Sequence, residues 1–224
     1  MQVIDIAYPA IVVLTFASAS IAILSKTLGW HPNIFYISKP LTTTLITLPV
    51  LRLIPDSTST YVPLIAGGLV FALIGDILLM LPENRFVLGI GSFATTHALY
   101  LAAFISAVGL ALINPSTVPL ILFSVIMTRF LWSGLRKSLQ IPVAAYIVLI
   151  TIMTAQAIGA ALEQEGAGLA IAAAGAVLFL ASDSMLAIDR FRLPFKAAQA
   201  LVLSTYWLGQ WLIALSARFE VSVF

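Results

Sequence analysis

The sequence predicts an all-α integral membrane protein that crosses the bilayer about eight times. Three observations favour this fold class. Of the 224 residues, 61% are hydrophobic and only 9% are charged, whereas soluble domains carry about 25% charged residues. The mean hydropathy is +1.09. The apolar residues also gather in continuous runs, each near the roughly 20 residues that a helix needs to cross a bilayer.

Turn-forming residues divide these runs into predicted helices. The runs are continuously apolar rather than alternating, and backbone groups in lipid must pair internally, so helices are favoured over a barrel. The predicted spans, of which the second is the shortest, are residues 6–28, 38–54, 62–82, 86–108, 114–135, 141–162, 166–189 and 196–219. The Pro-, Gly- or Asn-containing breaks that separate them are, in order, residues 29–33, 55–57, 82–84, 114–115, 140–142, 163–166 and 192–194.

Composition restricts the domain organisation and the chemistry. No segment between the runs is long enough for a soluble domain, so residues 1–224 are predicted to form a single membrane domain. The chain begins MQVID, which lacks the positive segment of a signal peptide, so the first run is expected to be a retained helix. A net charge of +2 does not indicate a nucleic-acid partner. The absence of cysteine excludes disulfides, thiolate catalysis and cysteine zinc sites.

The basic residues predict an orientation, because cytoplasmic loops of membrane proteins carry an excess of Lys and Arg. If the N-terminus lies outside, only Arg52 and Arg218 fall on the outer side. Both termini are therefore expected to be extracytoplasmic. The nine basic residues on the inner side are Lys26, Lys39, Arg85, Arg129, Arg136, Lys137, Arg190, Arg192 and Lys196, and we interpret Arg190 and Arg192 mostly as topology signals.

Two aspartates lie inside apolar runs, Asp76 in VFALIGDILLMLP and Asp183 in AVLFLASDSMLAI. A carboxylate in hydrocarbon costs about 2.5–3.5 kcal/mol or more, so such residues usually serve a function. Each lies six residues before the predicted inner end of its helix, a depth of about 9 Å for both. The similar local sequences predict a 4+4 parallel internal repeat, in which the third and fourth helices correspond to the seventh and eighth.

Other polar residues within the spans lie at helical spacing and form stripes on single helix faces. They could line a site with the aspartates, or they could only hydrogen-bond between helices. Lys39 and Arg136, at inner helix ends, could also anchor the chain at the interface or form a buried ion pair with an aspartate. The candidate substrate-binding residues are Lys39, His97, Tyr100, Arg136, Tyr146, Tyr206 and Gln210.

The residue types favour carboxylate chemistry without a metal or other cofactor. A catalytic zinc site usually needs three protein ligands, whereas this chain has two histidines, one of them in a predicted loop. No convincing Ser–His–Asp arrangement is present. Two close carboxylates in a low dielectric divide their protonation, so that one holds a proton while the other stays ionised. Asp76 and Asp183 could thus supply an acid and a base. Intramembrane acids in a parallel repeat are also typical of proton-coupled carriers. A lipid-binding membrane protein without chemistry is a further alternative.

The order and spacing of several motifs resemble those of the YhhN-type lysoplasmalogenases, which hydrolyse the vinyl ether of lysoplasmalogens. The resemblance covers most of the chain. The motifs are Lys39-Pro40-Leu41-Thr42, Gly75-Asp76 with Leu79-Met80, the stretch from Gly89 through Phe93 to His97-Ala98-Leu99-Tyr100 and Phe104, Pro142-Val143 with Tyr146 and Met153, Phe179-Leu180-Ala181-Ser182-Asp183-Ser184-Met185-Leu186-Ala187, and Thr205-Tyr206 with Gln210.

The resemblance implies a lysoplasmalogenase that uses Asp76 and Asp183 for catalysis. Its expected substrate is a lysophospholipid that enters from the inner leaflet, and its expected products are a fatty aldehyde and a glycerophospho-alcohol. Lys39 and Arg136 would hold the phosphate. We expect a multi-pass protein of a bacterial inner membrane. Headgroup preference and the assignment of acid and base to the two aspartates stay open at this point.

Overall fold

The computed structural model describes residues 2–81, 85–164 and 166–221, and within these ranges it contains α-helices, one short 3₁₀-helix and no strand. The predicted all-α fold class is confirmed. The helices are α1 (Gln2–Thr27), α2 (Pro32–Leu51), η1 (Ile54–Asp56), α3 (Tyr61–Met80), α4 (Phe86–Val108), α5 (Thr117–Trp132), α6 (Lys137–Glu163), α7 (Ala167–Phe191) and α8 (Ala198–Val221).

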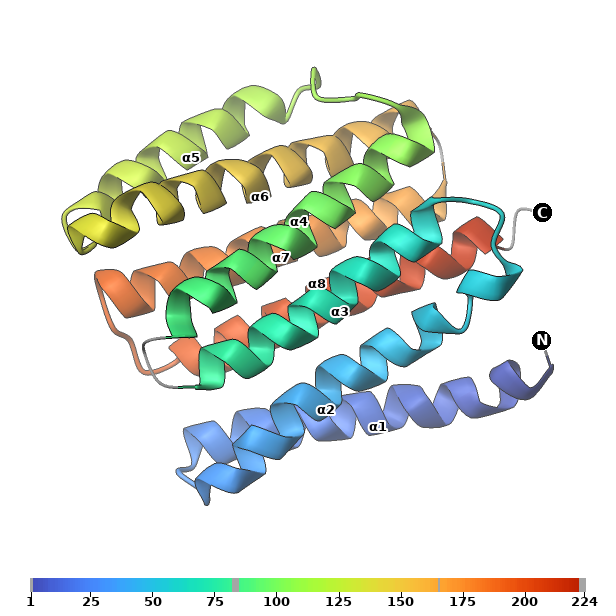
Figure 1. Ribbon diagram of the computed structural model, residues 1–224, viewed down its shortest axis with the longest axis horizontal. Coiled ribbons are helices and arrows are strands. Elements are labelled where there is room, and N and C mark those ends of the chain that lie inside the picture. The colour runs from blue at the N-terminus through green and yellow to red at the C-terminus, as the bar shows by residue number, and fades with distance from the viewer. Residues whose placement is uncertain (1, 82–84, 165, 222–224) are drawn as a thin grey trace.

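The helices form a bundle in which chain neighbours run in opposite directions (Figure 1). Helices α3, α4, α7 and α8 lie in the middle, α1 and α2 cover one side, and α5 and α6 cover the other. The most extensive contacts join α7 to α8 and α3 to α4. Helix α1 begins and α8 finishes at one end of the bundle, whereas α1, α3, α5 and α7 each finish at the opposite end. We call this opposite end the basic end, because most of the chain's Lys and Arg residues lie near the helix ends there.

Seven helices of the described chain are long and apolar enough to cross a membrane, and α5 is the shorter exception. Its 16 residues extend about 24 Å at 1.5 Å per residue, compared with the roughly 30 Å of a hydrocarbon core. The prediction of residues 114–135 for this span was therefore too long. The Asn114 side chain accepts a hydrogen bond from the amide of Ser116 at 3.0 Å, and this turn delays the helix start to Thr117.

The second span, in contrast, is longer than predicted. Helix α2 begins at Pro32 rather than at residue 38 and has 20 residues. Pro suits the first position of a helix, since its ring presets φ and the missing N–H has no helical partner there. His31 caps the helix, its Nδ1 accepting from the Asn33 amide at 3.3 Å. The His31-Pro32 pair was the sequence signal for this start.

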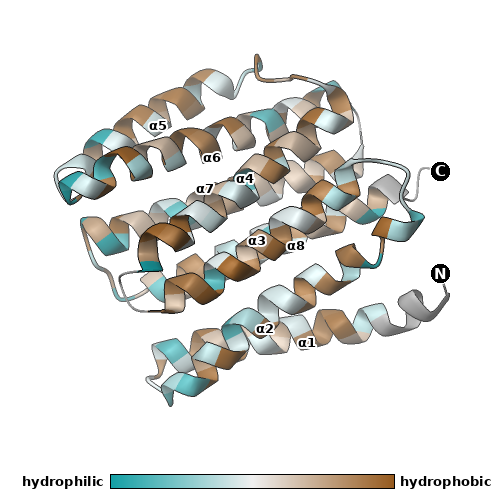
Figure 2. Cartoon of the chain, viewed as in Figure 1, coloured by the Kyte–Doolittle hydropathy of each residue, from teal (hydrophilic) through white to brown (hydrophobic). Residues whose placement is uncertain are grey.

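Apolar side chains cover both the interior and the outer surface of the bundle, and Figure 2 shows hydrophobic residues along the length of the helices. On the outward face of α5, Ile121, Leu122, Val125 and Ile126 are 54–67% exposed. A continuous exposed apolar face on a helix is typical of contact with lipid rather than water. Together with the seven candidate spans, this identifies an integral multi-pass membrane protein.

Glycines allow α7 and α8 to approach closely. A Cβ on Gly175 would lie 2.7 Å from the carbonyl oxygen of Gly209, and a Cβ on Gly209 would lie 2.8 Å from that of Gly175. Small residues at helix crossings in membranes let backbones pack together and gain van der Waals contact. This crossing fixes Tyr206, on α8, relative to Asp183, on α7.

The helix ends place the two aspartates differently from expectation. Asp76 lies four residues before Met80, the last residue of α3, whereas Asp183 lies eight residues before Phe191, the last residue of α7. The equal count of six was wrong, because α3 ends earlier and α7 continues further than the turn signals indicated. Both helices still run in the same direction, toward the basic end.

Candidate active site

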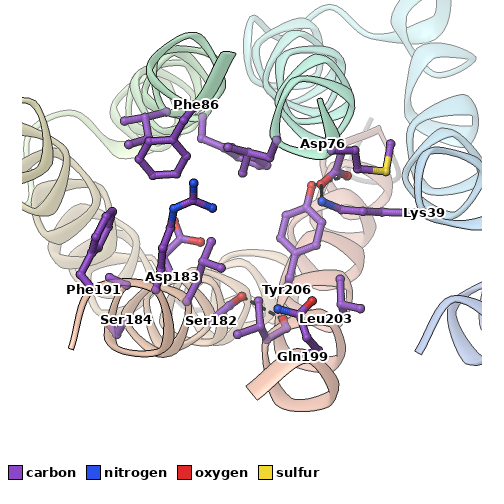
Figure 3. Close-up of a pocket in the computed structure, with 18 of the residues that line it drawn as sticks. Lys39, Asp76, Phe86, Ser182, Asp183, Ser184, Phe191, Gln199, Leu203 and Tyr206 are labelled. Carbon is purple, nitrogen blue, oxygen red and sulfur yellow. Dashed lines mark hydrogen bonds and ion pairs between the residues drawn. The ribbon is translucent and has the colours of Figure 1, made fainter. Parts of the chain in front are cut away.

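A cavity of about 640 Å³ opens among the helices and is lined by both Asp76 and Asp183. Each of the eight α-helices of the described chain contributes at least one lining residue. Lys39, Tyr146 and Tyr206 also line the cavity. Figure 3 shows Lys39 and Tyr206 converging on Asp76, while Asp183 lies apart from them on α7. The fold thus brings both intramembrane acids to one space.

Asp76 is almost fully buried, with 1% of its side chain exposed, and is surrounded by donors. Lys39 Nζ lies 3.1 Å from its Oδ1. Thr43 Oγ1 and Tyr206 Oη donate to its Oδ2 at 2.6 and 2.9 Å. These partners come from α2 and α8, which both pack against α3. A buried charge needs such pairing, so the ion pair with Lys39 that the sequence left open is present.

A second layer of hydrogen bonds supports Tyr206. Gln210 Nε2 donates to Tyr206 Oη at 3.4 Å, and Tyr100 Oη donates to Gln210 Oε1 at 2.5 Å. On the other side, Trp207 Nε1 donates to Thr43 Oγ1 at 3.2 Å. Tyr100 and Gln210 do not line the cavity. They hold the donors of Asp76 in place from behind, as buried polar groups that satisfy one another.

Asp183 has different partners, and its side chain is 16% exposed. Tyr146 Oη donates to its Oδ2 in a short hydrogen bond. His97 Nε2 lies 2.8 Å from Tyr146 Oη and 3.5 Å from Asp183 Oδ2. His97 Nδ1 is the one buried side-chain nitrogen or oxygen of the described residues that has no hydrogen-bond partner. Tyr146 and His97 come from α6 and α4.

An aromatic layer separates the two polar groups. The ring of Phe179 lies 5.3 Å from that of Tyr206 and 4.7 Å from that of His97, between centroids. Phe93 packs edge-on against Phe179 at 6.1 Å and against Tyr206 at 5.8 Å. Within the part of the chain that the structure describes, the two aspartates share no hydrogen bond, and each has its own set of partners. The two carboxylates therefore do not share one proton directly.

The cavity has a cationic rim at the basic end. Arg190 and Lys26 both line it. The Arg190 guanidinium lies 3.9 Å from the ring centroid of Phe86, and Lys26 Nζ lies 5.0 Å from that of Phe35. Cation–π contacts of this kind orient a charge without neutralising it. Neither cation is paired with a carboxylate among the described residues.

The cavity also has an apolar branch. We give this name to the part of the cavity lined by Phe123, Met127 and Leu131 of α5 and by Val143, Ile147 and Ile150 of α6. Met127, Leu131, Val143 and Ile147 belong to a hydrophobic cluster separate from the main core. Apolar lining with a few placed polar groups is typical of small-molecule sites. The same cavity thus offers an apolar lining that suits an alkyl chain and cations that suit an anion.

The predicted site residues differ in whether they line the cavity. Lys39, Tyr146 and Tyr206 line the cavity, whereas His97, Tyr100 and Gln210 are buried behind it. Arg136 is exposed at the start of α6 and does not line the cavity. The sequence interpretation placed Thr43 on the helix face of Lys39 but took it for a packing residue, and it missed the contact of Trp207 and the position of Arg190. Thr43 had a signal, since it follows Lys39 by one helical turn.

Comparisons with known proteins confirm the resemblance to the YhhN family. The model of the YhhN family matches residues 34–217. The chain is 36% identical over 169 residues to a Bos taurus protein named lysoplasmalogenase TMEM86A, and the matched region covers 73% of this chain and 66% of that protein. It is 34% identical over 176 residues to Homo sapiens lysoplasmalogenase TMEM86B, covering 76% of this chain and 72% of that protein.

A bacterial relative is also similar. The chain is 27% identical over 181 residues to the Escherichia coli O157:H7 protein named uncharacterized membrane protein YhhN, covering 81% of this chain and 86% of that protein. No solved structure matches the chain.

Proposed function

The chain belongs to the YhhN family, and from this membership and the geometry of its cavity we propose that it hydrolyses the vinyl ether bond of lysoplasmalogens. The products would be a fatty aldehyde and glycerophosphocholine or glycerophosphoethanolamine. The proposal rests above all on one observation: a single membrane-embedded cavity holds two aspartates in different polar surroundings, with an apolar branch beside them. The relatives named lysoplasmalogenase support the substrate class.

The shape of the cavity supports a lysophospholipid as the substrate. The alkenyl chain would lie in the branch between α5 and α6, and the vinyl ether would lie between the aspartates. The phosphate would then reach the basic end, where Arg190 is held over Phe86. We assign the phosphate to Arg190, with Lys26 beside it, rather than to Arg136, because Arg136 does not line the cavity. A guanidinium can hold phosphate through two parallel hydrogen bonds.

The reaction needs one acid and one base. A protonated aspartate donates its proton to the β-carbon of the enol ether, whose π electrons form the new C–H bond and leave an oxocarbenium ion. The ionised aspartate takes a proton from water as the water oxygen attacks this cation. It then passes that proton to the glyceryl oxygen as the C–O bond of the hemiacetal breaks. The hemiacetal hydroxyl proton returns to the first aspartate, so both groups end as they began.

The proposal is tested by the release of aldehyde from a lysoplasmalogen by detergent-purified protein. The matched control substrate is the lysolipid with a saturated ether at the same position, which has no vinyl π bond to protonate. Aldehyde from the first substrate only is the expected result. Binding of both lipids without aldehyde would instead support a proton-coupled carrier or a lipid-binding protein, since carriers also keep acids within the membrane.

For this multi-pass membrane protein we propose a bacterial inner membrane, the location expected from the sequence. A bacterial relative named a membrane protein supports the proposal. The basic end, with its Lys and Arg residues, would face the cytoplasm. The lipid would then enter the cavity from the inner leaflet.

A further inference from the structure

We infer that Asp183 is the proton donor of the reaction, that Tyr146 and His97 hold it in the donating geometry, and that Asp76 is the ionised partner. The inference rests on the proposed function and gives each aspartate the role that the sequence left open. Both aspartates line the cavity, so position alone does not distinguish them. Their hydrogen-bond partners do.

Asp76 is held as a carboxylate by its surroundings. Its Oδ1 faces the ammonium of Lys39 at 3.1 Å, and its Oδ2 accepts from Thr43 and Tyr206. An ionised carboxylate is an acceptor only, and three donors satisfy it well. A proton on Asp76 would leave the buried Lys39 cation without its partner, and a buried unpaired charge is costly. Asp76 therefore starts the reaction ionised.

Asp183 lacks a cation of this kind. Its Oδ2 accepts from Tyr146, and its Oδ1 has no partner in the described part of the chain. Among the described residues Asp183 forms no ion pair with Lys or Arg, and a carboxyl group without such a pair avoids the cost of a buried charge by keeping a proton. That proton belongs on Oδ1, since Oδ2 already accepts a hydrogen bond. With 16% of the side chain exposed to the cavity, this Oδ1–H is the group that can reach a substrate.

The unpartnered nitrogen of His97 decides whether the imidazole is a cation. A charged imidazole would carry a hydrogen on both nitrogens, and the hydrogen on Nδ1 would be a buried donor with nothing to receive it. The neutral form with its hydrogen on Nε2 avoids that cost and donates to Tyr146 Oη at 2.8 Å. Tyr146 then donates to Asp183. The chain of donors from His97 through Tyr146 to Oδ2 thus has a single direction.

This chain of donors matters most after the proton has left. When Asp183 Oδ1 gives its proton to the β-carbon, the carboxylate that forms already accepts the Tyr146 hydroxyl. Hydrogen bonds to a charged acceptor are about twice as strong as those to a neutral one. Tyr146 and His97 therefore stabilise the product of the proton transfer more than its reactant. They are positioning residues for Asp183, and their effect belongs to kcat rather than to substrate binding.

The assignment is tested by hydrogen exchange in heavy water, using the vinyl ether as the probe. In Asp76→Asn, Asp183 delivers a deuteron and the cation forms, but the base that activates water is missing. The cation therefore returns a hydron from its CHD group to Asp183 and re-forms the vinyl ether. Whenever rotation about the carbon–carbon single bond presents the original hydrogen, that hydrogen is lost and recovered lysoplasmalogen keeps deuterium at the β-carbon. In Asp183→Asn, no proton is delivered and recovered substrate gains none. Mass spectrometry of the recovered lipid measures both. Exchange in Asp183→Asn but not in Asp76→Asn would reverse the assignment. Exchange in neither variant, with turnover lost in both, would also overturn it.

Folding and the proposed function are controlled separately. Asp76→Asn leaves Lys39 unpaired, so the double variant with Lys39→Met is made beside it and must give the same exchange result. Wild-type protein is assayed for aldehyde under the same conditions. No aldehyde from wild type would refute the proposed function itself, whereas active wild type with the wrong exchange pattern refutes only the assignment.

The donors are tested by variants that differ in one hydrogen bond. Tyr146→Phe is expected to lower kcat about tenfold to a hundredfold with KM little changed, the range for a lost hydrogen bond to a charged group. Tyr61→Phe is the matched control, because the Tyr61 hydroxyl contacts Ser216 and does not line the cavity. An equal kcat loss in both variants would reduce Tyr146 to a structural role.

His97 is tested by conservative rescue. His97→Gln keeps a neutral N–H donor and is expected to stay within a few-fold of wild-type kcat, whereas His97→Phe loses the donor and should match Tyr146→Phe. If Gln were as inactive as Phe while both proteins fold, His97 would act through its charge, and the neutral donor chain would be wrong.

Discussion

At the scale of single residues, Asp76 and Asp183 occur in similar local sequences, yet they have different hydrogen-bond and ion-pair partners. Asp76 is paired with a cation, and Asp183 is hydrogen-bonded to a phenol. The ion pair with Lys39 was one of the alternatives that the sequence left open, whereas the contact of Asp183 with Tyr146 was not predicted as a pair. Which of these residues meet depends on how helix faces are rotated and crossed, and the spacing along one helix does not contain that information.

At this scale we expect Asp76→Asn and Asp183→Asn each to lower turnover by at least about a thousandfold, as expected for the loss of a general acid or base. Both proteins should still insert and give a monodisperse species in detergent, since Asn keeps the side-chain volume. Aldehyde release and thermal unfolding are measured on the same preparations. Near-wild-type activity in either variant would rule out the pair of aspartates as acid and base.

Two arginines near the basic end give a matched comparison. Arg190→Met should raise KM by about tenfold or more with kcat less affected, because a phosphate contact made equally in ground and transition states contributes to binding alone. Arg136→Met should leave both constants unchanged, because Arg136 does not line the cavity. Steady-state kinetics with one lysoplasmalogen measure both. A rise in KM confined to Arg136→Met would indicate that Arg136 binds the phosphate, as the sequence suggested.

At the scale of elements, the sequence predicted the order and type of the helices and misjudged their ends. Composition alone marks where an apolar run exists, whereas helix ends depend on local hydrogen bonds. Asn114 delayed α5 through such a hydrogen bond. The early start of α2 comes from the His31 cap, which accepts from the Asn33 amide, and from the preset φ of Pro32. The shift in the ends of α3 and α7 had a larger effect, since it removed the equal depth that the sequence predicted for the two aspartates. Their lining of one cavity, and not an equal depth, supports a shared site.

The crossing of α7 and α8 provides a test of packing. Gly175→Ala would place a Cβ 2.7 Å from the Gly209 carbonyl oxygen, and overpacking of this kind costs about 1–3 kcal/mol. The melting temperature in detergent should fall by several degrees. Gly91→Ala, whose Cβ meets nothing within 4 Å, should leave it unchanged or slightly higher. Equal shifts would mean that the two helices can separate without loss.

At the scale of the whole molecule, the contacts of the aspartates follow the pattern expected of a 4+4 repeat. Asp76 on α3 receives donors from α2 and α8, and Asp183 on α7 receives partners from α6 and α4. In a parallel repeat α2 corresponds to α6 and α4 to α8, so each acid would be served by its own half and by the last helix of the other. The repeat stays a prediction. The contacts of α8 with Asp76 and of α4 with Asp183 are what such a repeat would explain.

The chemistry of the whole site predicts resistance to chelation. Activity should survive exhaustive treatment with EDTA, because Asp76 already pairs with Lys39, and two histidines without cysteine offer few further ligands. The measurement compares aldehyde release before and after chelation and after adding back divalent ions. A loss restored by one divalent ion would contradict acid–base catalysis by aspartates alone.

The short α5 makes membrane topology the strongest test of the whole fold. If all eight helices cross, both termini lie on one side, as they do at one end of the bundle (Figure 1). The bias of nine basic residues against two places that side outside the cytoplasm. Reporters fused to either terminus should therefore both read as extracytoplasmic. If α5 did not cross, the number of crossings would be odd and the C-terminus would read as cytoplasmic. Phe123 and Met127 of α5 line the cavity. That result would therefore also contradict the proposed position of the alkenyl chain between α5 and α6.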